Sequence, residues 1–90
     1  MIDIKIENGI KKINNKRLED VLEGLNPIHT NINLIERIFN EITSEDDLVK
    51  ELNILKEKET PTALLLYIMR IGSFESLYEA NIIFAKVLEK

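Results

Sequence analysis

The chain has 90 residues and a formal net charge of −4, so it forms one domain with a small core. It contains no cysteine, which excludes disulfide scaffolds, zinc fingers, iron–sulfur clusters and cysteine nucleophiles. Its 44% hydrophobic and 31% charged residues are typical of a globular domain rather than a disordered one, and it has no apolar run long enough to span a membrane.

The first residues carry the pattern of a β-hairpin. Residues 2–6 alternate isoleucine with charged side chains, which is the period of a strand. Asn8 and Gly9 follow, and this pair favours a type I′ turn because both positions need positive φ. Residues 10–13 supply the returning strand. We expect a hairpin or extended arm over residues 1–14, and so short a hairpin must pack on the rest of the protein.

Three amphipathic helices are predicted in the middle of the chain, each with an apolar stripe and a polar capping residue at its start. Their expected spans are 16–25 after Asn15, 31–42 after Thr30 or Asn31, and 45–57 after Ser44. The first of them ends near Gly24 and Pro27, because the residue before proline avoids the α region. The acids that follow Ser44 favour the third, since they face the positive end of its dipole.

Two strongly apolar helices are predicted in the last thirty residues. Thr60 caps the first, Pro61 takes its first position, and Gly72 ends it in the left-handed conformation. Ser73 caps the second, which we expect over 74–88. Both helices carry more apolar surface than one core-facing stripe requires. They form either the centre of the bundle or an interface with another chain.

Most of the aromatic side chains lie in this same C-terminal region. Tyrosine suits interfaces because its ring is buried while its hydroxyl keeps a hydrogen-bond partner. We therefore predict a protein-binding surface formed by residues of the last two helices. The candidate residues are Leu65, Tyr67, Met69, Phe74, Tyr78 and Phe84.

Charge is unevenly distributed along the chain. Residues 1–17 hold five basic and two acidic residues, whereas 18–60 hold four basic and eleven acidic ones. The acidic middle repels phosphate groups, so nucleic-acid binding is not favoured for the molecule as a whole. A basic N-terminal cluster keeps a nucleic-acid-binding regulator open as an alternative. Its residues are Lys11, Lys12, Lys16 and Arg17.

No pattern in the sequence indicates an active site or a metal site. His29, the single histidine, precedes a helix and has no evident nucleophile or orienting carboxylate. The acids at 45–47 lack the frame of a calcium loop. Glu19 and Glu23 lie opposite an apolar stripe and are expected to be solvated, which does not favour acid–base catalysis. We expect a protein that is not an enzyme and has no metal or cofactor.

The last thirty residues contain a proline, a leucine pair, an aromatic thirteen residues after the proline, a Leu-Tyr pair and a later lysine. The residues of this pattern are Pro61, Leu64, Leu65, Tyr67, Phe74, Leu77, Tyr78 and Lys86. The pattern resembles the C-terminal region of type III secretion needle and inner-rod subunits. The resemblance implies a small helical subunit that polymerises through its C-terminal helices. In size and helix number the chain also resembles bacteriocin immunity proteins, which are cytoplasmic four-helix bundles.

These patterns together predict a mainly α-helical protein, a bundle of four or five short helices with an N-terminal β-hairpin or arm. Residues 1–90 form one domain, with helices in 15–90. Its predicted function is to bind another protein, or a second copy of itself, through the apolar C-terminal helices. The alternatives are a bacterial or phage inhibitor or immunity-type bundle and the nucleic-acid-binding regulator. We expect a cytoplasmic location, or export without a signal peptide if the secretion resemblance holds.

Overall fold

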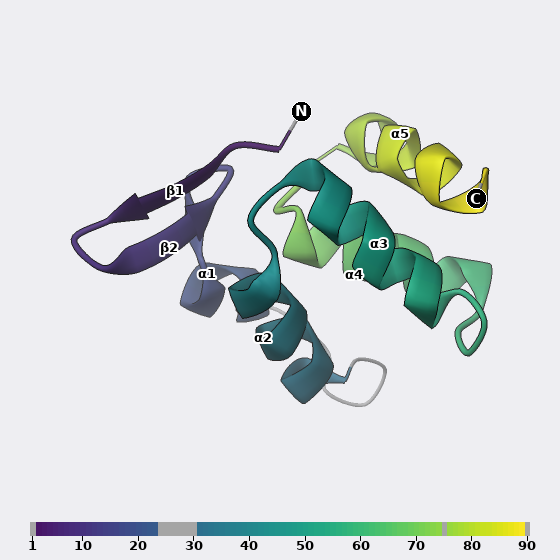
Figure 1. Ribbon diagram of the computed structural model, residues 1–90, viewed down its shortest axis with the longest axis horizontal. Helices are drawn as coiled ribbons and strands as arrows, with labels where there is room; N and C mark the ends of the chain where they lie inside the picture. The colour runs from purple at the N-terminus through teal and green to yellow at the C-terminus, as the bar shows by residue number, and fades with distance from the viewer. Residues whose placement is uncertain (1, 24–30, 75, 90) are drawn as a thin grey trace.

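The computed structural model describes residues 2–23, 31–74 and 76–89, in which a three-stranded antiparallel sheet precedes five helices (Figure 1). The elements in chain order are β1 (Ile4–Glu7), β2 (Ile10–Ile13), β3 (Lys16–Arg17), α1 (Leu18–Leu22), α2 (Ile32–Glu41), α3 (Glu45–Leu55), α4 (Pro61–Ile71) and α5 (Leu77–Leu88). The predicted mainly helical fold with an N-terminal hairpin is confirmed.

The sheet is built by two tight turns of the same kind. Asn8 and Gly9 both have positive φ between β1 and β2, as expected for a type I′ turn. Asn14 and Asn15 repeat this geometry between β2 and β3, with φ values of 51° and 66°. This second turn was not among the predicted elements. The signal was present, since asparagine tolerates the left-handed region better than most residues.

The second turn corrects the prediction for the first helix. Residues 16–17 form β3 instead of a first helical turn, so the predicted cap at Asn15 is wrong. α1 begins at Leu18, and the Asp20 carboxylate accepts a hydrogen bond from the Arg17 backbone N–H at 3.2 Å. The predicted end of this helix at Gly24 and Pro27, the loop holding His29 and the alternative cap Thr30 lie outside the described residues.

The next three helices start where the sequence predicts. The side chains of Asn31, Ser44 and Thr60 accept hydrogen bonds from backbone N–H groups three residues ahead, at 3.1–3.2 Å. Pro61 occupies the first turn of α4, where its missing N–H costs nothing. The predicted starts agree with the structure because a cap depends only on residues within one helical turn.

The connection between α4 and α5 differs from the prediction. Gly72 ends α4 but is right-handed, with φ −78°, and Ser73 takes the left-handed position at φ 54°. The N–H of Phe74 donates to the Met69 carbonyl at 3.0 Å, which completes a Schellman motif. Phe74 thereby turns into the core, and α5 begins at Leu77 with Ser76 as its cap, not Ser73.

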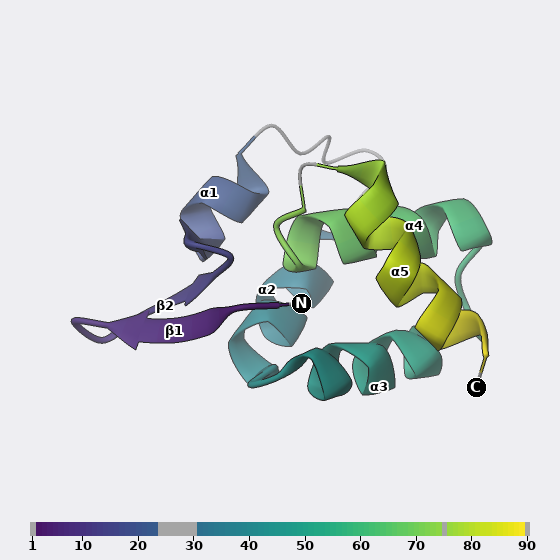
Figure 2. The same cartoon turned by 90° about the horizontal axis from the view of Figure 1, so that it is seen from above.

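The core lies among the helices and extends to the sheet through Ile13 and the partly buried Ile4. α5 packs against α3 and α4, and α2 packs against α4. The sheet projects away from the helices at one end of the molecule (Figure 2). Its anchor is Ile13, which is 0% exposed. The largest fully buried side chains are Phe39, Ile13, Ile35, Ile38, Ile42, Leu48, Leu52, Ile68, Ile71, Ile83 and Val87.

Candidate protein-binding surface

Helix α5 divides its apolar side chains between the core and the solvent. Ala80, Ile83 and Val87 recur at helical spacing and are at most 2% exposed. Large apolar side chains also cover the opposite side: Leu77 is 57% exposed, Tyr78 76%, Ile82 48% and Leu88 56%. Ala85 and the polar Asn81 lie between them, and both are exposed. We term the following five residues the α5 outer face: Leu77, Tyr78, Ile82, Ala85 and Leu88.

Helix α5, which carries the outer face, is held in place by its N-terminal cap and by packing on two other helices. Its helix is capped by Ser76, whose hydroxyl accepts a hydrogen bond from the Tyr78 N–H at 3.1 Å. The inner side of the helix packs on both α3 and α4, as the views in Figures 1 and 2 also show. Because α5 is anchored on two helices, its outer side chains are presented by a rigid backbone.

An ion pair fixes the flank of α5 to the start of α3. The Lys86 ammonium contacts Glu45 Oε1, and Glu45 Oε2 accepts a hydrogen bond from the Ile2 N–H at 3.3 Å. The hydrogen bond from Lys86 lowers the pKa of the Glu45 carboxyl below its usual range, and the same contact raises the pKa of Lys86. Glu45 therefore joins the N-terminal segment, α3 and α5.

An open cleft of about 950 Å³ runs beside the outer face. α5 contributes Tyr78, Glu79, Ile82 and Lys86 to its wall, and residues of the sheet and of α3 form the opposite side. Since Tyr78 and Ile82 belong to both, the cleft and the outer face form one continuous surface. Glu79 and Lys86 mark the flank of α5 that faces the cleft.

The six predicted protein-binding residues differ in how deeply they are buried. Tyr67 and Phe74 are core residues, 5% and 8% exposed. Leu65, Met69 and Phe84 are partly buried against the core. Among the six, Tyr78 alone lies on the surface with a large exposed ring.

The outer face also includes Leu77, Ile82 and Leu88, which the sequence analysis did not select. The helical spacing showed two apolar sides on this segment. It did not indicate which side faces inward, because that depends on where α3 and α4 lie.

The four basic residues of the N-terminal cluster do not gather on one surface. Lys11 turns into the body of the protein and donates to the carbonyls of Asn40, at 3.1 Å, and of Ile42. Burial lowers its pKa, which nearby Asp47 partly offsets. Lys11 thus caps the C-terminal end of α2. Lys16 lines the cleft.

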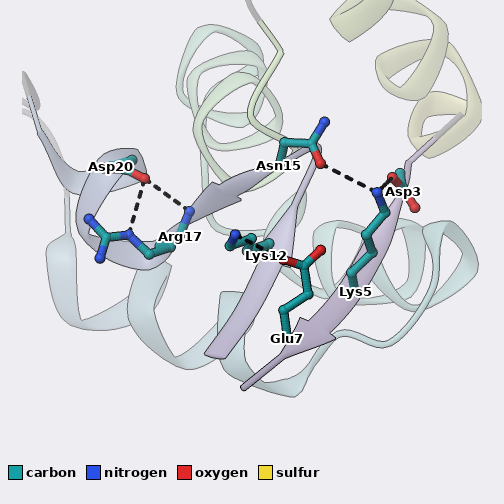
Figure 3. A network of polar contacts seen from close by, with 7 residues as sticks. All are labelled: Asp3, Lys5, Glu7, Lys12, Asn15, Arg17 and Asp20. Atoms are coloured by element: carbon teal, nitrogen blue, oxygen red, sulfur yellow. Dashed lines mark hydrogen bonds and ion pairs between the residues drawn. The ribbon is translucent and has the colours of Figure 1, made fainter. Parts of the chain in front are cut away.

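The other two members of the basic cluster are paired with acids on the polar side of the sheet (Figure 3). Lys12 Nζ lies 3.1 Å from Glu7 Oε2, and Arg17 Nε lies 3.5 Å from Asp20 Oδ2. The hydrogen bonds from Arg17 lower the pKa of Asp20. These pairs reduce the positive potential that a phosphate backbone would require.

The described ranges contain no group of three or more acidic or histidine side chains that could hold a metal ion. At the start of α3, Asp47 instead accepts a hydrogen bond from the Thr43 N–H at 2.9 Å, and Glu45 pairs with Lys86. Within the same ranges, no helix has the length and apolar character needed to cross a membrane.

Comparisons with known proteins add no family to this description. No protein-family model, curated protein or solved structure matches the chain. The resemblances to secretion subunits and to immunity proteins stay predictions. The α5 outer face and the cleft beside it are therefore the features of the molecule that bear on its function.

Proposed function

We propose that this chain is a non-catalytic protein-binding module and that the α5 outer face is its docking surface. One observation carries the proposal: four large apolar side chains of a single helix are 48–76% exposed while the other side of that helix is in the core. Burying apolar surface stabilises a complex by about 25 cal/mol per Å². A partner that covers the outer face gains this free energy.

The arrangement of these side chains distinguishes them from ordinary exposed apolar residues. The remaining large exposed ones are dispersed, with Ile6 and Ile10 at the hairpin, Ile54 on α3 and Leu66 on α4. Single exposed apolar residues are normal, whereas several large ones gathered on one side of a helix indicate an interaction site. Tyr78 stands between the outer face and the cleft, a position suited to an aromatic interface residue.

The more specific assignment we propose is an assembly subunit, with an immunity-type inhibitor as the alternative. Of the residues that resemble secretion subunits, Leu77 and Tyr78 lie on the outer face and Lys86 lies on its flank. This placement supports assembly through α5. An inhibitor would use the same surface but would bind a different protein.

Site-specific photo-crosslinking tests the proposed function. A photoreactive phenylalanine derivative replaces Tyr78 in one variant and Ile54, which is 63% exposed on α3, in the control. In cells that contain the natural partners, we expect a discrete crosslinked product from position 78 and none from position 54. No product from position 78, or the same product from both positions, contradicts the proposal.

A further inference from the structure

We infer that the α5 outer face binds a second copy of this chain, with the two α5 helices antiparallel across a two-fold axis near Ile82. The inference rests on the proposed function, because it names the occupant of the same surface. A two-fold interface brings one patch against itself, so the patch must complement its own rotated image. The outer face has this property in shape and in charge.

The complementarity in shape follows from positions along the helix. With a rise of about 1.5 Å per residue, Tyr78 lies about 6 Å before Ile82 and Ala85 about 4.5 Å after it. Antiparallel helices therefore place the large Tyr78 ring against Ala85 of the second copy. Leu77 meets Leu88 of the second copy in the same way. A parallel pair would instead oppose the two tyrosines and the two alanines.

The complementarity in charge concerns the flank beside the cleft, where Glu79 and Lys86 both lie. A two-fold axis perpendicular to both helices keeps the two cleft flanks on the same side. Glu79 then faces Lys86 of the second copy, and the reverse contact forms as well. Lys86 can make this contact while it keeps Glu45, since an ammonium has three donors and its side chain is 50% exposed. In a parallel pair the two cleft flanks would lie on opposite sides of the interface, so neither contact between Glu79 and Lys86 could form.

The size of the surface predicts a weak, reversible dimer. A helix of 12 residues is about 18 Å long, so the contact is smaller than the ~800 Å² per partner of a standard interface. The monomer already has a complete core of buried side chains and does not need the partner to fold. We expect a dissociation constant of about 0.1 mM.

Sedimentation velocity from low micromolar to millimolar concentration tests the inference. We expect the wild-type mass to rise from the monomer value towards twice that value. Ile82→Asp places a charge at the axis twice per dimer and should weaken association more than tenfold. Ile54→Asp is the matched control, because the same change at an exposed isoleucine of α3 should leave association unchanged. A wild-type protein that stays monomeric, or equal association of the two variants, overturns the inference.

A charge exchange tests the antiparallel arrangement. Glu79→Lys alone and Lys86→Glu alone each create like-charge contacts in their own dimers and should associate more weakly than wild type. A mixture of the two restores opposite charges at both contacts and should associate at least as well as wild type. A mixture that associates no better than either variant overturns the arrangement. Thermal melts show whether Lys86→Glu, which also loses the Glu45 contact, is still folded.

The crosslinking experiment distinguishes failure of this inference from failure of the proposed function. A product of twice the monomer mass from position 78 supports both. A product with a different protein, from a chain that stays monomeric at millimolar concentration, overturns self-association and leaves the protein-binding function in place. The absence of any product, together with a constant monomer mass, contradicts both.

Discussion

Ser73 occupies a backbone position that glycine usually fills. It is the left-handed residue of the Schellman motif that ends α4, with its N–H donating to the Arg70 carbonyl at 3.2 Å. Its hydroxyl oxygen is buried and has no hydrogen-bond partner among the described residues. The preceding Gly72 does not take the left-handed position in place of Ser73, because its φ is negative. The glycine stands one position too early for the motif.

We therefore predict that Ser73→Gly stabilises the protein by about 1 kcal/mol. Glycine adopts the left-handed backbone conformation without strain, and the substitution also removes an unpaired buried hydroxyl. Urea unfolding measures the change in the free energy of unfolding. The control is Ser76→Gly at the N-cap of α5, which should cost a few tenths of a kcal/mol. A loss of stability in Ser73→Gly would refute this account of the turn.

Gly72 is required for a different reason, the proximity of an aromatic ring. A Cβ atom at this position would lie 2.6 Å from a ring carbon of Phe74. Gly72→Ala should therefore destabilise the protein by ~1–3 kcal/mol, although alanine favours helix by about 1 kcal/mol. Chemical denaturation measures the loss. In a Phe74→Leu background the same substitution should cost less, and an equal cost would show that the ring is not responsible.

At the scale of elements, the sheet completes the ends of two helices. Lys11 donates to the last carbonyls of α2, and Asn14 Nδ2 donates to the Gly72 carbonyl at the end of α4, at 2.5 Å. Ile13 inserts between these two polar contacts into the core. The hairpin is stable because it is docked, as expected for so few residues.

Ile13→Ala should therefore destabilise the whole protein by ~2–5 kcal/mol, the usual cost of emptying a buried site of this size. Ile10→Ala on the same strand is the control, because this side chain is 45% exposed and its loss should cost under about 0.5 kcal/mol. Thermal unfolding followed by circular dichroism compares the two. Similar melting temperatures for both variants would mean that the sheet is not part of the cooperative unit.

The ion pair between α3 and α5 makes stability depend on pH. The folded-state pKa of Glu45 is lowered, so its contribution is present above the unfolded pKa of about 4.3 and is lost as pH falls through the folded value. The pKa of Lys86 is raised, so its contribution is present below about 10.4 and is lost at higher pH. Both contributions are complete between these limits.

We expect wild type to be more stable than Glu45→Gln at pH 6–7, with the difference decreasing below about pH 4. Urea midpoints measured across this range test the prediction. Glu36→Gln on α2 is the control, because Glu36 forms no ion pair with the other described residues. A difference that is constant down to pH 2 would exclude Glu45 as the titrating group.

At the scale of the whole molecule, acidic partners neutralise much of the basic N-terminus. Lys12 and Arg17 are paired with acids and Lys11 is turned into the body. We expect no salt-sensitive binding of labelled single- or double-stranded nucleic acid at 50 mM salt below about 10 μM protein. Fluorescence anisotropy tests this. Binding that disappears when Lys12 and Lys16 are neutralised would revive the nucleic-acid-binding alternative.

Features that form within one turn of the chain follow from the local amino-acid sequence alone. The Asn8-Gly9 turn and the caps at Asn31, Ser44 and Thr60 lie where the pattern predicts. Each depends on one side chain, one hydrogen bond or one φ value. The second turn at Asn14-Asn15 obeys the same rule and was predictable in principle.

Which side of α5 faces the core, and therefore where the candidate site lies, depends on long-range packing. Tyr67, Phe74 and Tyr78 are similar in type and in local pattern, yet the first two are buried and the third is 76% exposed. Periodicity shows which sides of a helix are apolar, but it does not show which of two apolar sides faces the core. α3 and α4 cover the side with Ala80, Ile83 and Val87, and none of the described helices covers the other apolar side, which is exposed.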